Sequence, residues 1–149
     1  VEGYRRHFRP SAYLSEPRVG VGVHVLCAET EAEARRLATS RNLAKLKTAL
    51  GQRGGVPSVE TALAYRYSPP ELAYIAEFSR SYIDGTPQQV KAALEALAEQ
   101  YKTTDLSIVT ICYGFAERVR SYELLAEACG LKPPTASSAS TESAKPCAS

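Results

Sequence analysis

The chain has 149 residues, of which 44% are hydrophobic and 23% charged, and its formal net charge is +2. That length allows one domain with a real hydrophobic core, and the composition is ordinary for a globular protein. So small a charge does not favour nucleic acid or an anionic membrane as a partner, and no apolar run approaches the roughly 20 residues that span a bilayer. The opening residues, V-E-G-Y-R-R-H-F-R-P, are charged and lack the apolar segment of a secretory signal.

The chain opens with what reads as the end of a helix. Arg5, Arg6 and Arg9 gather there around two aromatic residues, and the helix ends before Pro10 because the residue preceding a proline avoids the helical conformation. These arginines could form a phosphate-binding patch, but we expect them to be the solvated end of the helix. The sequence has no methionine and begins inside this helix. We therefore expect it to be part of a longer protein.

The clearest strand pattern is R-V-G-V-G-V-H-V-L-C, from Arg18 to Cys27. Its valines alternate on one face, and Gly20, Gly22 and His24 occupy the other face. Two glycines on one face indicate that something bulky approaches closely, either interior side chains of a barrel or a cofactor. His24 is either a satisfied interior histidine or a donor that lines a pocket.

Residues 30–80 carry helical signals and no strand pattern. Thr30 and Glu33 can form a capping box at the start of a helix that reaches about Leu50. The loop G-Q-R-G-G-V-P at 51–57 lacks the Lys-Ser/Thr ending of a phosphate-binding loop. We expect the first helix to be peripheral and the whole stretch to be a helical excursion from a sheet. The polar side of that helix is predicted to hold Arg35, Arg36, Arg41, Lys45 and Lys47.

The stretch from Ser81 to Arg118 reads as a short strand, a sharply capped helix and a buried strand, which is the order of a βαβ unit. Thr86 is a natural N-cap, Pro87 suits the first helical position, and Gln89 can complete a capping box. In the segment 106–112 both alternating sets of residues are mostly apolar. This pattern predicts a strand that is buried on both faces of a parallel sheet.

A last helix is predicted from Phe115 to Cys129, followed by Gly130 in the position that favours a left-handed helix end. Its inner stripe is predicted to be Phe115, Val119, Tyr122, Ala126 and Cys129. The remaining residues are rich in serine, alanine and proline and have few apolar side chains. We therefore expect 132–149 to be a disordered tail.

The cysteines predict neither a disulfide framework nor a zinc site. They are widely spaced, at Cys27, Cys112, Cys129 and Cys147. Zinc sites need closer spacing or histidine partners, and the chain has two histidines, one of them His24. We expect small buried thiols, no bound metal and a reducing cytoplasm as the compartment.

Three strand candidates, each followed by a helix, are too few to close a sheet, since a (β/α)8 barrel needs about 250 residues. Four stretches resemble the C-terminal part of luciferase-like monooxygenases, the flavin-dependent (β/α)8 barrel superfamily of bacterial luciferase. They are Y-R-R-H-F-R-P-S-A-Y-L at 4–14, V-G-V-H-V-L-C-A-E-T-E-A-E-A at 21–34, I-D-G-T-P-Q-Q-V at 83–90, and T-D-L-S-I-V-T at 104–110 with R-V-R-S-Y-E-L-L-A-E-A at 118–128. Two places depart from the family pattern: His24 stands where members often have Asn, and Gly114-Phe115 stands where they often have Asp-His.

The resemblance implies an α/β fold that is the C-terminal part of a (β/α)8 barrel, with about three strands and hence an incomplete barrel. These last three strands would lie around 18–27, 81–84 and 105–112. They would belong to a domain over 1–131, interrupted by a helical insertion at about 30–80.

The resemblance also implies reduced FMN as the cofactor and oxygenation of a small organic substrate. A flavin reductase is a further implied partner, and we expect a homo-oligomer. Two alternatives stay open: an F420-dependent reductase of the same superfamily, and a non-catalytic flavin-binding or assembly fragment. The main flavin-binding residues of the family lie in earlier strands. No catalytic residue is therefore carried onto this chain, the chain alone is expected to be inactive, and His24 is the pocket candidate.

Overall fold

A computed structural model describes residues 1–131, so the predicted disordered tail at 132–149 lies outside the described residues. The elements within the described part follow the order α1 (Glu2–His7), β1 (Gly20–Cys27), α2 (Glu31–Ala49), α3 (Val59–Ala64), α4 (Pro69–Ser79), β2 (Ile83–Gly85), α5 (Pro87–Tyr101), β3 (Asp105–Val109) and α6 (Phe115–Ala128). The structure is thus an α/β fold, and the helices predicted to begin at Glu31, Pro87 and Phe115 begin at those residues. None of the described helices is both long enough and apolar enough to cross a membrane.

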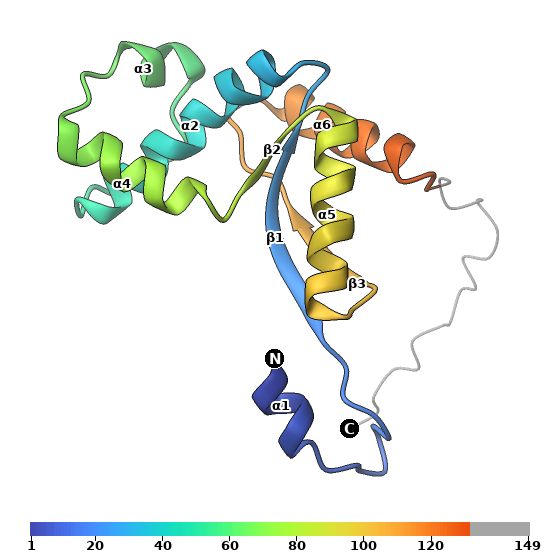
Figure 1. Cartoon of the computed structure of the whole chain (residues 1–149). Helices are drawn as coiled ribbons and strands as arrows, with labels where there is room; N and C mark the ends of the chain where they lie inside the picture. The colour runs from blue at the N-terminus through green and yellow to red at the C-terminus, as the bar shows by residue number, and fades with distance from the viewer. Residues whose placement is uncertain (132–149) are drawn as a thin grey trace, which may run out of the picture.

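The three strands form one parallel sheet in the order β2-β1-β3 (Figure 1). β2 pairs with the last residues of β1, Val25–Cys27, and β3 pairs with the preceding residues, Gly20–His24. Consecutive strands of a (β/α)8 barrel are neighbours, so three consecutive barrel strands would place β2 in the middle. The sequence analysis predicts that β2 and β3 are joined by α5 as neighbouring strands of one βαβ unit. In the structure β1 lies between them, so β2 and β3 are not adjacent. The reason is that β2 is very short and α5 returns the chain to the other edge of β1.

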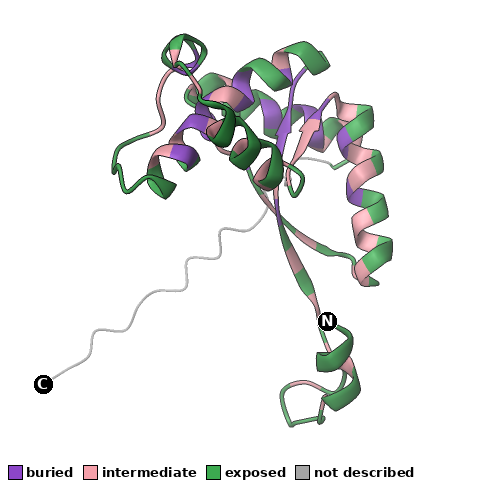
Figure 2. Ribbon diagram, turned by 60° about the vertical axis from the view of Figure 1, so that its left-hand side comes forward, coloured by how far each residue is buried: buried purple, intermediate pink, exposed green. Residues whose placement is uncertain are grey.

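One face of the sheet is covered and the other is largely open. Val23, Val25 and Cys27 of β1 pack against apolar residues of α5 and α6. Gly20, Gly22 and His24 face the other way, together with the β3 residues that pair with them. The prediction that the last strand is buried on both faces is wrong, because alternate residues of β3 are exposed. Leu106 and Ile108 of β3 pack against the core, and the residues between them are exposed. Figure 2 shows the buried residues gathered where the helices meet the sheet, while the opposite end of β1 is exposed or intermediate.

Helix α2 is central to the packing, although the sequence analysis predicts a peripheral helix. Its first half packs with Leu26 of β1, and its second half packs with α3 and α4 through Leu43 and Leu46. The three helices lie together beside the carboxyl ends of β1 and β2 (Figure 1). Arg41, which the sequence analysis places on the solvent side, is buried in this helix.

Helix α6 packs through a different stripe from the predicted one. Ser121, Leu124 and Leu125 are its buried residues. Ser121 fills a specific role, since its Oγ accepts a hydrogen bond of 2.9 Å from the backbone N–H of Cys27. Phe115 of the predicted stripe is 71% exposed, so an apolar face of α6 has no cover in the described structure. Gly130 ends the helix with φ +67°, as predicted.

Candidate functional site

The open face of the sheet carries a polar cluster where β1 and β2 end. Parallel α/β folds bind their ligands at the carboxyl ends of the strands, because the loops that follow the strands gather there. The cluster consists of His24 from β1, Tyr82 and Asp84 at β2, and Arg41 from α2. Asp84 pairs in register with Leu26, so Asp84 and His24 lie on the same face of neighbouring strands.

Arg41 and Asp84 form a buried ion pair. The two terminal nitrogens of the guanidinium donate to the two carboxylate oxygens of Asp84, at 2.8 and 2.7 Å. The Arg41 side chain is 3% exposed and that of Asp84 is 20% exposed. Asn42 Oδ1 accepts a further bond of 3.2 Å, and the guanidinium lies 4.3 Å from the centre of the Tyr82 ring. Two parallel bonds fix the orientation of the guanidinium as well as its position.

His24 is half-buried beside this pair. Its ring centre lies 4.7 Å from that of Tyr82, and its Nδ1 is enclosed without a hydrogen-bond partner among the described residues. Burial lowers the pKa of His24, and the positive charges of Arg41 and Lys45 lower it further, while Asp84 acts in the opposite direction. His24 is therefore neutral near pH 7. A neutral imidazole offers one donor and one acceptor to a ligand.

Of the two glycines on the His24 face, only Gly22 leaves the backbone uncovered. A Cβ added at Gly22 would meet no atom within 4 Å, and one at Gly20 would lie 3.3 Å from the Asp105 carboxylate. The sequence predicts a bulky group packed closely against these glycines, but no atom of residues 1–131 takes that place at Gly22. The surface beside His24 is a flat, open stretch of β1.

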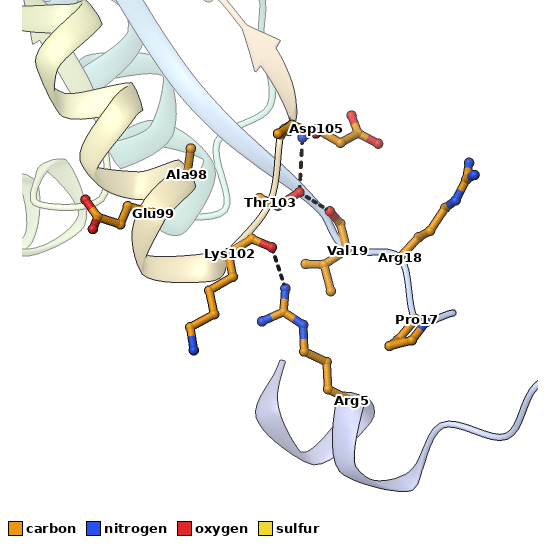
Figure 3. A pocket seen from close by; sticks show the side chains of 10 residues that line it. Arg5, Pro17, Arg18, Val19, Ala98, Glu99, Lys102, Thr103 and Asp105 are labelled. Carbon is orange, nitrogen blue, oxygen red and sulfur yellow. Dashed lines mark hydrogen bonds between the residues drawn. The ribbon is translucent and has the colours of Figure 1, made fainter. Parts of the chain in front are cut away.

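A cleft of about 560 Å³ lies at the opposite, amino-terminal end of the sheet (Figure 3). Arg5 reaches it from α1 and donates to the backbone oxygens of Tyr101 and Lys102, at 2.6 and 2.8 Å. These carbonyls belong to the end of α5, so this guanidinium caps a helix and is not a free anion-binding group. Thr103 Oγ1 donates to the Val19 carbonyl across the same cleft. The cleft joins α1 to the sheet.

The N-terminus of α5 also has its donors occupied. The backbone N–H of Gln89 donates to Thr86 Oγ1 at 3.4 Å, and the N–H of Thr86 donates to Gln89 Oε1 at 2.9 Å. The predicted capping box is confirmed. Since it uses the groups that would bind a phosphate, this helix start offers no phosphate site.

The thiols have the character of structural residues. Cys27 and Cys112 are buried, and burial raises the pKa of Cys27 to about 11, which keeps it protonated. Cys129 is exposed, so the prediction of a buried thiol is wrong there, and Cys147 lies outside the described residues. No group of three or more metal-binding side chains occurs within residues 1–131.

Of this cluster, the sequence analysis found His24 and missed its three partners. Arg41 follows Ala34, Leu37 and Ala38 at the spacing of one helical face, so it continues the buried stripe of α2. A charged residue on an apolar stripe is a detectable signal, because it needs a buried partner. Which carboxylate supplies that partner depends on the tertiary fold.

The class of protein follows from these features: a parallel α/β chain with α5 and α6 on one face of its sheet and, on the other face, α2 and a polar cluster at the strand ends. No family model matches the chain. It is 41% identical over 132 residues to the uncharacterized protein YwcH of Bacillus subtilis, and the matched region covers 86% of this chain and 39% of that protein. It is 32% identical over 114 residues to the N-acetyl-S-alkylcysteine monooxygenase of the same organism, covering 76% of this chain and 34% of that protein.

Two further comparisons point the same way. The luciferase-like monooxygenase of Escherichia coli is 24% identical over 121 residues, covering 81% of this chain and 36% of that protein. The crystal structure of apo-MsnO8 superposes with a TM-score of 0.77 at 31% identity, covering 89% of this chain and 40% of the other. This chain belongs to the luciferase-like monooxygenase family. It spans less than two fifths of the length of the curated relatives that it matches.

Proposed function

We propose that the chain is the C-terminal part of a (β/α)8 barrel in a flavin-dependent monooxygenase, which uses reduced FMN and oxygen on a small organic substrate. The observation that carries this proposal is the unfinished state of the sheet. The amino-terminal half of β1 has a partner on one side, and β3 likewise has one described neighbour. A groove of about 350 Å³ runs along the free edge of β1, past Val21 and Gly22. A barrel closes such edges with further strands.

The strand order supports a specific assignment within that barrel. β1 and β3 are adjacent and parallel, and α5 lies between them in the sequence. We assign them as two consecutive barrel strands with α5 as their crossover helix. Residues 28–86 then form the insertion of the domain over 1–131, and β2 is a short strand within it. This replaces the assignment of β2 as a barrel strand.

The described residues fit one part of a flavin site. Uncovered backbone at Gly22 and the half-buried imidazole of His24 on the same face suit a planar heteroaromatic ring with a hydrogen-bonding edge. A bound flavin would supply the redox chemistry. His24 would hold its edge, and Tyr82 would support His24. A site for the flavin phosphate would come from residues outside this chain.

The test is a comparison of the full-length protein with this chain. We expect the full-length protein to bind FMN, measured by quenching of flavin fluorescence, and to consume oxygen when given reduced FMN and a thioether or related small substrate. This chain alone should not turn over reduced FMN above the uncatalysed rate. Tighter binding of F420 than of FMN, with no oxygen consumption, would instead favour the F420-dependent reductase. A flavin reductase supplied in the assay tests that partner directly.

A non-catalytic assembly role is the second candidate, and one observation favours it. β3 has one described neighbour, and the segment that follows it carries the exposed apolar side chains Tyr113, Phe115 and Val119. Free edges and apolar surface promote pairing between chains. Sedimentation of this chain as a discrete dimer, together with failure of the full-length protein to bind any flavin, would support that role.

A further inference from the structure

Two side chains from separate elements, Arg41 of α2 and His24 of β1, meet at the ring of Tyr82. The guanidinium of Arg41 lies 4.3 Å from the ring centre, and the ring of His24 lies 4.7 Å from it at an interplanar angle of 56°. Asp84, two residues after Tyr82, holds the same guanidinium through two bonds. Helix α2 is thus linked to His24 of β1 through the ring of Tyr82.

We propose that Arg41 is a positioning residue: it acts through Tyr82 to hold the His24 imidazole in one orientation and uncharged, as the hydrogen-bonding contact for a flat heteroaromatic ring on the open face of β1. This inference rests on the proposed function, in which that ring is the flavin. The shape of the ligand follows from Gly22, which shares the His24 face and leaves space beside it.

The geometry explains the fixed orientation. Arg41 is almost fully buried, and its two bonds to Asp84 leave little rotational freedom. A guanidinium over an aromatic face is attracted to the ring, so the position of Arg41 restrains the position of Tyr82. The ring of Phe78 on α4 restrains Tyr82 further, at 5.7 Å between centres. Tyr82 in turn is the aromatic neighbour of His24.

The charges around His24 explain why it stays neutral. Burial opposes a positive charge on the ring, as do Arg41 and Lys45 on α2, and these effects lower the pKa of His24. Asp84 on β2 favours the charged form, but it is already paired with Arg41. Val109 of β3, which pairs in register with His24, carries no charge.

The first experiment follows the His24 ring by NMR titration in the full-length protein. Arg41→Met removes a positive neighbour and frees Asp84, so the pKa of His24 should rise. Asp84→Asn removes the opposing carboxylate, so the pKa should fall. If Arg41 and Asp84 only pack around His24, both variants should move the His24 pKa in the same direction, towards the pKa of an exposed histidine. That result would overturn the proposal. If Arg41→Met does not fold, Lys45→Met tests the same charge effect from an exposed position and should raise the pKa.

The second experiment measures FMN affinity. His24→Leu should weaken binding about tenfold, the effect of losing one hydrogen bond, and His24→Gln should restore it to within about threefold. His7→Leu on the exposed helix α1 is the matched control and should leave affinity unchanged. FMN affinity should fall at low pH, where His24 becomes protonated. In Arg41→Met this fall should begin at a higher pH than in the unaltered protein. Unchanged affinity in His24→Leu would refute the contact.

The two experiments separate the two proposals. If the unaltered full-length protein binds no FMN, the proposed function is wrong, while opposite shifts of the His24 pKa would still show that Arg41 keeps His24 uncharged. If FMN binds and the His24 pKa shifts have the same sign, the flavin function stands and the positioning role is refuted.

Discussion

The Arg41–Asp84 pair should show a strongly asymmetric response to mutation. Asp84→Ala leaves a guanidinium that is 3% exposed with Asn42 Oδ1 and the Tyr82 ring as its remaining partners. Removing one partner of a buried ion pair costs about 3–5 kcal/mol of stability, because the other charge stays buried. Arg41→Met leaves the Asp84 carboxylate, which is 20% exposed and can be hydrated. We expect a smaller loss there, about 1–3 kcal/mol.

The double variant Arg41→Met/Asp84→Ala gives the decisive comparison. It leaves no unpaired buried charge, so it should be less destabilised than Asp84→Ala alone, with a coupling of at least about 1 kcal/mol. The measurement is urea unfolding of the four proteins, with the free energies extrapolated to water. Glu77→Ala breaks the exposed pair with Arg80 and is the matched control, with an expected change below about 0.5 kcal/mol. If the double variant loses as much stability as the two single variants added together, the pair does not act as described.

Three further outcomes follow from burial and capping. Leu26→Ala should cost about 2–5 kcal/mol by urea unfolding, whereas Leu72→Ala should change stability by less than about 0.5 kcal/mol, since the two side chains are 0% and 52% exposed. At pH 8 an alkylating reagent should label Cys129 in the native protein and should label Cys27 only after unfolding, because burial raises the pKa of Cys27 to about 11. Peptide mapping by mass spectrometry checks this, and rapid labelling of Cys27 in the native protein would contradict it. Thr86→Ala should lower the thermal midpoint through a loss of about 1 kcal/mol, as it removes the cap of α5, and an unchanged midpoint would show that the cap contributes nothing.

Burial lowers the pKa of His24, and this has a consequence for the stability of the fold. Protonation of a histidine whose pKa is lowered on folding is disfavoured in the native state. The unfolded chain then binds more protons below its ordinary pKa of about 6.5, so stability should fall as the pH drops through that value. His24→Gln should remove this part of the pH dependence, which unfolding at a series of pH values would detect.

The local structure was largely predictable from the sequence, because its signals are short-range. The cap at Thr86 and the end of α6 at Gly130 depend on backbone groups only a few residues away. The alternating valines of β1 predict a strand with one covered face, whichever elements cover it. These signals placed the helix starts correctly and identified His24 on the face opposite the valines.

The tertiary structure decided what short-range signals do not contain. The order β2-β1-β3 depends on where α5 returns the chain, and the buried stripe of α6 depends on which face meets the sheet. The charge of Arg41 predicts a solvated side chain, but its partner, Asp84, lies 43 residues away in the sequence and only the fold brings the two together. Long-range pairing made that charge stable inside the protein, and it brought Arg41, Tyr82 and His24 to one site at the ends of the strands.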